Sequence, residues 1–435
     1  MPSPPAPVFA LLVFTSGSYE GAVIRDLRLA DELHRRGYPV HIYWMMETNA
    51  SLVKEKIPQR LLCRGQRYQR SKPSGLFDAA GQLLRLYPAQ RRRRFVQQHP
   101  DYLNRLTCHF INAVCDGDPA LEARLEQWLI RDGVTHLLPT FAMTCPFAQA
   151  VKARGRHAFD YLVTFQGEEI FANYAQQIGR AADYYRRLRD AAAASGWKAI
   201  AVSLDYIARL HAEMGLDVDR TVAIHPGIDL PDTTSPPPFE ALLTKLPELR
   251  PDVPIITYFG RQDSEKGIDL LLYAARMLQE RKVPFQLVAC GGSSFGLRYR
   301  EVCEEIARHL RVRVMWKRRV SDDLRAALYT HSRCIVYPSI HREPFGMVAP
   351  EAMSHGTPVV VPNYGGITEA IRVDGKSGGL TFKVWDTADL ASTLERLITD
   401  DTLHAELSHN AKQIAPTFSV ANMTDRILTH LGITP

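Results

Sequence analysis

The feature that most constrains the fold of this chain is a succession of strand, glycine-bearing loop, helix and strand that occurs twice. The first copy reads VFALLVF, TSGSYEG, AVIRDLRLADELHRRG and YPVHIYW, and the second, which begins at Pro254, reads PIITYFG, RQDSEKG, IDLLLYAARMLQER and PFQLVACGG. The apolar positions of the first helix recur at intervals of three and four residues. Continuous apolar strands that alternate with amphipathic helices are typical of parallel sheets covered on both faces. The sequence therefore predicts an α/β fold with two doubly wound, Rossmann-like domains.

Proline marks the boundary between these two domains. Eight of the 28 prolines fall between residues 226 and 254, and proline interrupts helices and interior strands. We therefore predict an N-terminal domain over residues 1–230, a proline-rich linker over 231–252 and a C-terminal domain over 253–415. Residues 416–435 are expected to form a helix that packs back on the N-terminal domain.

Composition excludes several classes of protein. A hydrophobic content of 46% with 23% charged residues is that of a globular chain, and a net charge of +6 does not predict a nucleic-acid partner. The seven cysteines are odd in number and form no CxxC pair, so neither a disulfide framework nor a zinc site is expected, and a reducing cytoplasm fits best. The VFALLVF run is too short for a signal peptide, and no segment approaches the ~18 apolar residues of a membrane span. Any membrane contact is therefore expected to be peripheral, at the cytoplasmic face.

The loop RQDSEKG of the second copy carries two cations, Arg261 and Lys266, between a strand and a helix. In open parallel sheets, ligands bind beyond the carboxyl ends of the strands, where such loops lie. An arginine fork and a lysine point charge beside a helix N-terminus are suited to a phosphate or diphosphate. From these residues alone, the alternative that both are solvated loop charges stays open.

The segment REPFGMVAPEAMSHG places two glutamates, Glu343 and Glu351, around a Pro-Phe-Gly turn. Because Pro350 fits only in the first turn of a helix, the helix is expected to begin at Gly346 to Val348, and the backbone N–H groups there would be available to phosphate oxygens. Glu351 is suited to the diol of a ribose, and Glu343 would reach whatever lies beyond the phosphates. A nucleoside diphosphate with a hydroxyl-rich group attached fits this pattern. The alternative is that Glu351 only caps a helix and Glu343 lies in solvent.

Several ordered segments resemble the retaining glycosyltransferases of family 4, which use a GT-B fold of two Rossmann-like domains facing each other across a cleft. EPFGMVAPEAMSHGTPVV resembles the family signature of two glutamates separated by seven residues, and FGRQDSEKGIDLLLYA resembles its phosphate-binding loop. VPNYGGITEAIRVDGKSGGL resembles the next strand and loop, and SLDYIARLHAEMGLDVDRTVAIHPGID the end of the first domain. The resemblance covers about residues 8–50 and 130–430.

The resemblance implies an enzyme that moves a sugar, with retention, from a nucleotide-sugar donor to a hydroxyl acceptor. The donor would bind the C-terminal domain and the acceptor the N-terminal domain. A UDP-sugar is the first choice and a GDP-sugar the second. The acceptor hydroxyl would attack from the face of the leaving group and a phosphate oxygen would take its proton, so Glu343 is not assigned as a nucleophile.

The resemblance also assigns roles to the candidate residues. Arg261 and Lys266 would neutralise the diphosphate and Glu343 would bind hydroxyls of the transferred sugar, so these three are the implied catalytic residues. Preorganised cations stabilise the charge that grows on the leaving diphosphate, and neither a metal ion nor a cofactor is expected. The implied donor-binding residues are Gly17, Gln166, Phe345, Gly346, Met347, Val348 and Glu351.

Gln166 departs from the family pattern. At this position, after the strand YLVTF, the family usually carries a histidine that touches the donor sugar. Glutamine can hydrogen-bond a hydroxyl but does not titrate near neutral pH. The departure weakens any inference about which sugar is transferred, but it does not remove the activity.

Other functions and sites remain open as alternatives. A nucleotide-sugar epimerase or a glycosyl phosphorylase can use the same two-domain architecture, although no signature of lysine-bound pyridoxal phosphate is present. A non-catalytic nucleotide-sugar-binding subunit is a third hypothesis, and the complete set of candidate cations and glutamates argues against it. The tripeptides DGD at 116–118 and DVD at 217–219 match the aspartate pair of metal-dependent glycosyltransferases. Such short matches are common by chance, and we assign no metal site.

Residues 51–110 form a basic segment that the resemblance does not explain. Thirteen lysines and arginines there oppose three acidic residues, and RRRR occupies 91–94. A solvated surface is one explanation. The other is an insertion in the acceptor domain that attracts an anionic or lipid-linked acceptor, or the surface of a membrane.

Overall fold

The computed structural model describes residues 6–14, 21–45, 53–62, 100–232, 234–292, 298–318 and 320–435. The chain divides into two compact units, which are Met1–Gly227 together with Val420–Pro435 and, between them, Ile228–Ser419. We call them unit 1 and unit 2. Two sequence predictions lie outside the described residues: the role of Gly17, and the part of the basic segment that contains Arg91 to Arg94.

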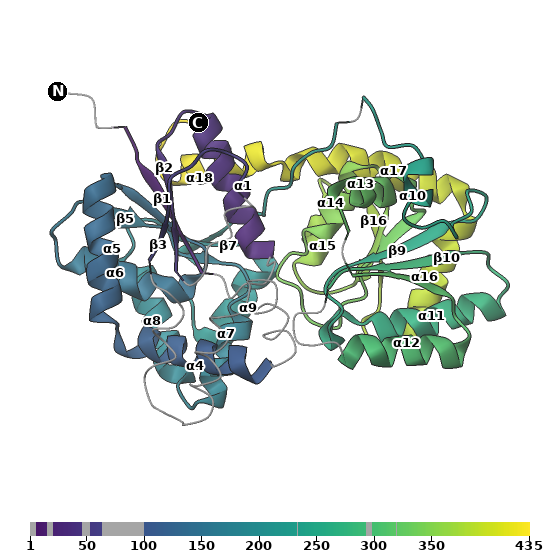
Figure 1. Cartoon of the computed structure of the whole chain (residues 1–435), viewed down its shortest axis with the longest axis horizontal. Coiled ribbons are helices and arrows are strands. Elements are labelled where there is room, and N and C mark those ends of the chain that lie inside the picture. The colour runs from purple at the N-terminus through teal and green to yellow at the C-terminus, as the bar shows by residue number, and fades with distance from the viewer. Residues whose placement is uncertain are drawn as a thin grey trace. The chain divides into compact units, whose positions relative to one another are not determined.

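Unit 1 is built on parallel strands. Within its described residues, five of them form one sheet in the order β3-β2-β1-β4-β5 (Figure 1), and three form a second sheet in the order β6-β7-β8. Every pairing in both sheets is parallel. The strands are β1 (Phe9–Val13), β2 (Val40–Trp44), β3 (Gln59–Leu61), β4 (His136–Pro139), β5 (Asp160–Tyr161), β6 (Thr164–Phe165), β7 (Ala199–Ala201) and β8 (Thr221–Ala223).

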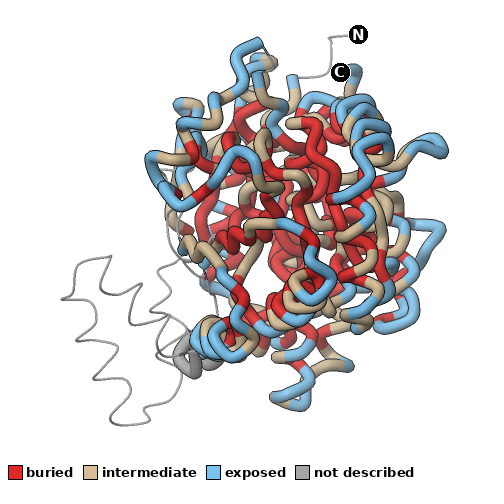
Figure 2. The backbone as a smooth tube through the Cα atoms, turned by 90° about the vertical axis from the view of Figure 1, so that its right-hand side faces the viewer, coloured by how far each residue is buried: buried red, intermediate tan, exposed pale blue. Residues whose placement is uncertain are grey.

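The helices of unit 1 bury the apolar stripes seen in the sequence. Val23, Leu27 and Leu33 of the first helix pack in one core cluster with residues of β1 and β2, and Ile427 of the last helix joins the same cluster. For the described chain as a whole, Figure 2 shows buried residues inside and exposed residues mostly along the outside. The helices are α1 (Gly21–Arg35), α4 (Pro100–Asp116), α5 (Pro119–Asp132), α6 (Cys145–Ala153), α7 (Glu169–Gln177), α8 (Ala181–Ala194), α9 (Leu204–Met214) and α18 (Val420–His430).

Unit 2 contains one larger parallel sheet in the order β11-β10-β9-β12-β13-β16. Its strands are β9 (Ile255–Phe259), β10 (Gln286–Cys290), β11 (Val314–Lys317), β12 (Cys334–Val336), β13 (Val359–Pro362) and β16 (Gly379–Phe382), beside a small antiparallel pair of β14 (Arg372–Val373) and β15 (Lys376–Ser377). The helices are α10 (Glu240–Leu243), α11 (Ile268–Glu280), α12 (Arg298–Leu310), α13 (Asp322–His331), α14 (Val348–Ser354), α15 (Ile367–Ala370), α16 (Thr387–Thr399) and α17 (Asp401–Ile414).

Each unit has a point where its strand order reverses. In unit 1 the chain runs outward from β1 to β2 and β3 and then returns to β4 on the other side of β1. In unit 2 it runs from β9 to β10 and β11 and returns to β12. The loops after the two central strands diverge at such a switch point, and ligands of open α/β sheets bind there. The two switch points are therefore where functional residues are expected.

The proline-rich segment differs from the predicted linker. Residues 231–252 belong to unit 2, where they include α10. Leu242, Leu246 and Leu249 are buried there, at 4% exposure or less, and this apolar burial fixes the segment against unit 2. At the other end, unit 2 extends to Ser419, and only from Val420 does the chain belong to unit 1. Among the described residues, no helix combines the length and the apolar character needed to cross a bilayer.

Candidate functional site

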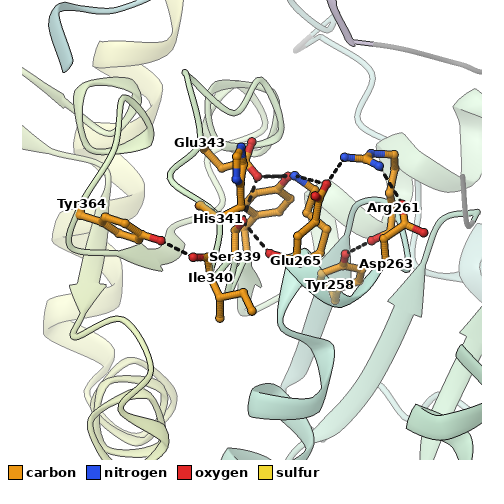
Figure 3. Close-up of polar contacts among 11 residues, drawn as sticks. Tyr258, Arg261, Asp263, Glu265, Ser339, Ile340, His341, Glu343 and Tyr364 are labelled. Carbon is orange, nitrogen blue, oxygen red and sulfur yellow. Dashed lines mark hydrogen bonds and ion pairs between the residues drawn. The ribbon is translucent and has the colours of Figure 1, made fainter. Parts of the chain in front are cut away.

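The switch point of unit 2 brings Lys266 and Glu343 together. Lys266 lies in a short 3-10 turn (Ser264–Lys266) directly after β9, and Glu343 lies on the loop that follows β12. The Lys266 Nζ donates a hydrogen bond to Glu343 Oε1. Figure 3 shows Glu343 among its neighbours on the same loop, with Arg261 and Glu265 of the loop after β9 nearby. The two residues are only 5% and 8% exposed. The structure thus pairs two of the residues that the sequence had singled out separately.

Gly267 allows the two loops to approach. Its φ of 65° lies in the left-handed region, and a Cβ atom there would lie 2.1 Å from the carbonyl oxygen of Pro338. No side chain fits such a contact, so the residue after Lys266 has to be glycine for the β9 and β12 loops to meet. The Lys-Gly dipeptide is the sequence signal of this close approach.

Glu343 is held in its ionised form. Besides Lys266, it accepts hydrogen bonds from the Ser339 hydroxyl at 2.8 Å and the Tyr337 hydroxyl at 3.2 Å. Burial by itself would raise the pKa of the carboxyl group, but the Lys266 ammonium, the nearby His341 and the hydrogen bonds from Lys266 and Ser339 outweigh it and hold the pKa at about 2. The carboxylate can therefore accept hydrogen bonds from a ligand but cannot supply a proton near neutral pH.

Arg261 is placed by acidic neighbours on its own loop. Its guanidinium group forms ion pairs with Asp263, at 2.7 Å, and with Glu265. The Tyr258 hydroxyl donates to the backbone carbonyl of Arg261 at 2.5 Å, and the Tyr258 ring is parallel to that of Tyr337. Burial opposes the charge of Arg261, but the two carboxylates raise its pKa. The sequence had indicated the cation but not its two acidic partners.

Glycines also fix the loop that carries Glu343. The backbone N–H of Gly366 donates to the carbonyl oxygen of Glu343 at 2.8 Å. A Cβ atom on Gly365, whose φ is 87°, would lie 2.9 Å from that same oxygen. The Tyr364 hydroxyl donates to the carbonyl of Ile340 on the loop after β12. The Asn-Tyr-Gly-Gly turn after β13 thus holds the backbone around Glu343, a role that sequence reasoning missed.

The second glutamate lies in the first turn of α14, which begins at Val348, within the range expected from Pro350. Glu351 accepts a hydrogen bond from the Tyr329 hydroxyl at 3.2 Å. Gly346 precedes the helix with a φ of 81°. The ring of Phe345 is buried and packs edge-on against Phe418 at 5.5 Å. At this position the backbone, and not the ring, is therefore the part that a ligand could contact.

Gln166 contacts the switch point of unit 1 from the second sheet. It directly follows β6, and its Nε2 donates to Asp26 Oδ2 at 3.2 Å and to the carbonyl oxygen of Thr140 at 2.5 Å. Thr140 directly follows β4, and Asp26 lies on α1. Asp26 is also paired with Arg25. Nothing in the sequence pattern had pointed to Arg25 or Asp26.

The two aspartate tripeptides have structural explanations. Asp118 is the N-cap of α5, and its side chain accepts from the Leu121 N–H at 3.0 Å, whereas Asp116 pairs with Arg180. Asp217 accepts from the backbone N–H of Asp219 in the turn before β8. In the described part of the chain, no group of three or more histidine, cysteine or acidic residues is arranged as metal ligands.

Comparison with known proteins places this site in a family context. Residues 244–414, all within unit 2, match the family described as Glycosyl transferases group 1. A curated D-inositol 3-phosphate glycosyltransferase of Rhodococcus erythropolis is 33% identical over 234 residues, which is 53% of this chain and 52% of the relative. The chain thus spans about half the length of the curated relatives it matches. The resemblance to glycosyltransferases that the sequence motifs indicated is confirmed.

Solved structures match over almost the whole chain. A complex of Anabaena Alr3699/HepE with UDP has a TM-score of 0.71 and 18% sequence identity, and the match covers 98% of this chain and 99% of that one. Sucrose-phosphate synthase from Thermosynechococcus elongatus has a TM-score of 0.69 and 19% identity, with 98% of both chains covered. At these identities the similarity shows the fold alone, and it confirms the predicted GT-B fold.

Proposed function

We propose that the protein transfers a sugar from a nucleotide-sugar donor to a hydroxyl acceptor, with retention of configuration and without a metal ion, because residues 244–414 match the family described as Glycosyl transferases group 1. The observation that carries the proposal is the buried pair of Lys266 and Glu343, beside Arg261, at the switch point of unit 2. Cations and an ionised carboxylate side by side fit a ligand that is anionic at one end and rich in hydroxyls at the other.

The donor diphosphate is assigned to Arg261, Lys266 and the backbone N–H groups of Gly346, Met347 and Val348. Lys266 carries three N–H donors, so it can bind phosphate oxygens while it remains paired with Glu343. The bond between sugar and phosphate breaks with growth of negative charge on the leaving group, and fixed cations stabilise that charge without reorganisation. UDP is the nucleotide of first choice, and a solved structural neighbour that contains UDP supports it.

The transferred sugar is assigned to Glu343. As a carboxylate with a pKa of about 2, it accepts hydrogen bonds from sugar hydroxyls. Glu351 is assigned to the ribose diol, and Gln166 to a further hydroxyl of the sugar. The acceptor hydroxyl attacks from the face that the diphosphate leaves, and a phosphate oxygen takes its proton. The protein then needs no carboxylate nucleophile.

The decisive experiment incubates the full chain with a panel of UDP-, GDP- and ADP-sugars and measures free nucleoside diphosphate. The acceptor panel includes inositol phosphate, because relatives of this chain carry the name D-inositol 3-phosphate glycosyltransferase. We expect release of nucleoside diphosphate from one class of donor and, by NMR, a product with the anomeric configuration of the donor. Lys266→Ala should lose this activity, whereas Lys383→Ala, an exposed lysine of the same unit, should retain it. Absence of release from every donor would refute the proposal.

Metal independence has its own test. The donor charge is already offset by Arg261 and Lys266, so activity should survive EDTA at full rate. Complete loss with EDTA, restored by Mn²⁺ or Mg²⁺, would contradict the proposed mechanism and would return attention to the DGD tripeptide at 116–118.

A further inference from the structure

Arg25 of unit 1 is a buried cation that its surroundings satisfy only in part. The residue is 2% exposed and lies in the second turn of α1. Its Nη1 donates to Asp26 Oδ1 at 2.5 Å. Its Nε and Nη2 atoms are buried and have no hydrogen-bond partner among the described residues. One nitrogen of three therefore carries the whole interaction with the protein.

The two unpaired nitrogens form a specific binding edge. In a planar guanidinium group, the Nε–H and one Nη2–H lie in the plane and point in the same direction from one edge. This edge matches two oxygens of a carboxylate or a phosphate, and such bidentate pairs are the strong ones. A buried donor left without an acceptor is costly, so the protein retains an unfavourable arrangement that a ligand with two oxygens would relieve.

The position of Arg25 connects it with the proposed reaction. Asp26 accepts from Arg25 through Oδ1 and from Gln166 through Oδ2. Both Gln166 interactions use Nε2, which leaves Gln166 Oε1 as the atom that can accept a hydrogen bond from a ligand hydroxyl. Gln166 is the residue of unit 1 assigned to the transferred sugar. Arg25 and Gln166 therefore share the carboxylate of Asp26. An anion bound at Arg25 would lie next to the residue that is proposed to contact the transferred sugar.

We propose that Arg25 binds an anionic group of the acceptor, a phosphate ester or a carboxylate, through its Nε and Nη2 edge. The acceptor class is then a hydroxyl compound that carries one anionic substituent close to the hydroxyl that receives the sugar. Arg25 binds the acceptor and takes no part in the chemical step. This inference rests on the proposed function and names the substrate class of the same enzyme.

The direct test is calorimetric titration of the full chain with inorganic phosphate and, separately, with acetate. It is done in an Arg261→Ala/Lys266→Met/Glu343→Gln background, so that the cations of unit 2 do not contribute and Glu343 is not left as a lone buried carboxylate. Two further changes are compared there. Arg25→Lys keeps a charge but loses the fork, and Arg25→Met/Asp26→Asn removes the buried pair together so that no lone carboxylate is left. Arg35→Gln, an exposed arginine on the same helix, is the matched control.

We expect phosphate or acetate to bind the starting protein, Arg25→Lys to bind it roughly tenfold more weakly, and the double variant to show no binding. The control should bind as the starting protein does. Tighter binding of phosphate than of acetate assigns a phosphate ester, and the reverse assigns a carboxylate. Absence of binding of either anion, or binding that Arg25→Lys leaves unchanged, overturns the proposal. If the double variant does not fold, the anion affinity of Arg25→Lys relative to the starting protein decides whether the proposal holds.

A second measurement uses the otherwise unmodified enzyme and pairs of acceptors that differ only in a phosphate ester or a carboxylate. Arg25→Lys should lower the ratio of kcat/KM for the anionic to the neutral acceptor by roughly tenfold, and Arg35→Gln should leave this ratio unchanged. An equal loss on both acceptors would show a merely structural role and overturn the proposal. This experiment also separates failure of the inference from failure of the proposed function. If the proposed function is wrong, no acceptor leads to release of nucleoside diphosphate, whereas the calorimetric titration still measures anion binding at Arg25.

Discussion

The two switch points of this molecule contain the same kinds of groups but satisfy them differently. In unit 2, Lys266 pairs with Glu343, and Glu343 in turn accepts from Tyr337 and Ser339. In unit 1, Arg25 pairs with Asp26 through one nitrogen, and its other two have no partner among the described residues. The same fold has thus produced one polar network that is complete and one with an open edge.

The pKa values of the two buried carboxyl groups, Glu343 and Asp26, are shifted in opposite directions. The pKa of Glu343 is held at about 2, because Lys266, His341 and the Ser339 hydroxyl outweigh the effect of burial. The pKa of Asp26 is raised, because burial outweighs the contributions of Arg25 and Gln166. A network that surrounds a carboxylate with donors preorganises its charge, whereas a partly satisfied one favours a further ligand. The network around Glu343 in unit 2 therefore holds its charges in a fixed arrangement. In unit 1, the unpaired edge of Arg25 is the group that we propose binds an anion.

The largest effect should follow from removing the cations of unit 2. We expect Lys266→Ala and Arg261→Ala each to slow transfer by about a hundredfold or more, because each removes a cation from the growing charge of the leaving diphosphate. Steady-state kinetics with the donor found in the panel measures this effect.

Lys266→Ala also leaves Glu343 buried without its counter-ion, and the loss of such a partner costs about 3–5 kcal/mol of stability. Unfolding curves of each variant are therefore needed beside the kinetics. Lys266→Met/Glu343→Gln removes the pair together and should fold normally while remaining inactive. Wild-type turnover in both single variants would contradict the assignment of the donor site to unit 2.

The pH dependence of stability should have opposite signs at the two switch points. The pKa of Glu343 is lowered from 4.5 to about 2, so its contribution is present above pH 4.5 and is lost as the pH falls toward 2. Between about pH 6 and about pH 3 the wild type should lose about 2 kcal/mol more of its unfolding free energy than Glu343→Gln does. The pKa of Asp26 is raised, so its contribution is present at low pH and is lost as the pH rises through its folded pKa.

Urea unfolding of wild type, Glu343→Gln and Asp26→Asn at several pH values measures both slopes. Relative to wild type, Glu343→Gln should become comparatively more stable as the pH falls, and Asp26→Asn comparatively less stable. Parallel curves for all three proteins would show that the two carboxyl groups do not differ as described.

The two α/β units and most residues of the site in unit 2 could be predicted from the sequence. Which charged residues pair with each other could not. The apolar strands and the helical stripe of Val23, Leu27 and Leu33 were enough to predict two parallel α/β units. The two cations of the loop RQDSEKG and the two glutamates were enough to select the site of unit 2. Lys266 and Glu343 are 77 residues apart, however, and they meet only because β9 and β12 are neighbours in the sheet. A single sequence does not reveal that strand order.

Arg25 and Asp26 were missed for a different reason. Arg25 lies off the apolar stripe of α1, where charged residues are ordinarily solvated, whereas Asp26, three residues after Val23, lies on that stripe. The segment after β6 brings Gln166 against Asp26. Which partner a buried charge finds depends on tertiary packing and is not visible in the local sequence. The same holds for the proline-rich segment, whose three buried leucines attach it to unit 2.

A smaller effect should separate two roles within the donor site. Glu351→Ala should weaken the binding of UDP roughly tenfold, because the ribose diol loses a charged hydrogen-bond acceptor. Glu343→Gln should bind UDP like wild type, since UDP lacks the transferred sugar that Glu343 is proposed to contact, but it should turn over more slowly. Calorimetry with UDP and steady-state kinetics distinguish the two. Equal affinity of wild type and Glu351→Ala for UDP would count against the ribose assignment.

The smallest effect should come from the basic segment of the acceptor unit. Replacing Arg91 to Arg94 with glutamine removes four of the thirteen positive charges of residues 51–110. If this segment attracts an anionic acceptor or an anionic membrane surface, transfer or binding to anionic vesicles should fall by roughly threefold at low salt, and less at high salt, where exposed charges are screened.

Hydrolysis of the donor to free sugar should not change in this variant, because the donor is assigned to unit 2. A charge change in unit 1 should lower only the transfer to the acceptor. Lys266→Ala, in contrast, should slow both transfer and hydrolysis of the donor. Replacing four exposed lysines or arginines of unit 2, such as Lys383, by glutamine is the matched control for net charge. If transfer and vesicle binding are both unchanged at low ionic strength, the basic segment is a solvated surface, and Arg25 alone remains to attract the acceptor to unit 1.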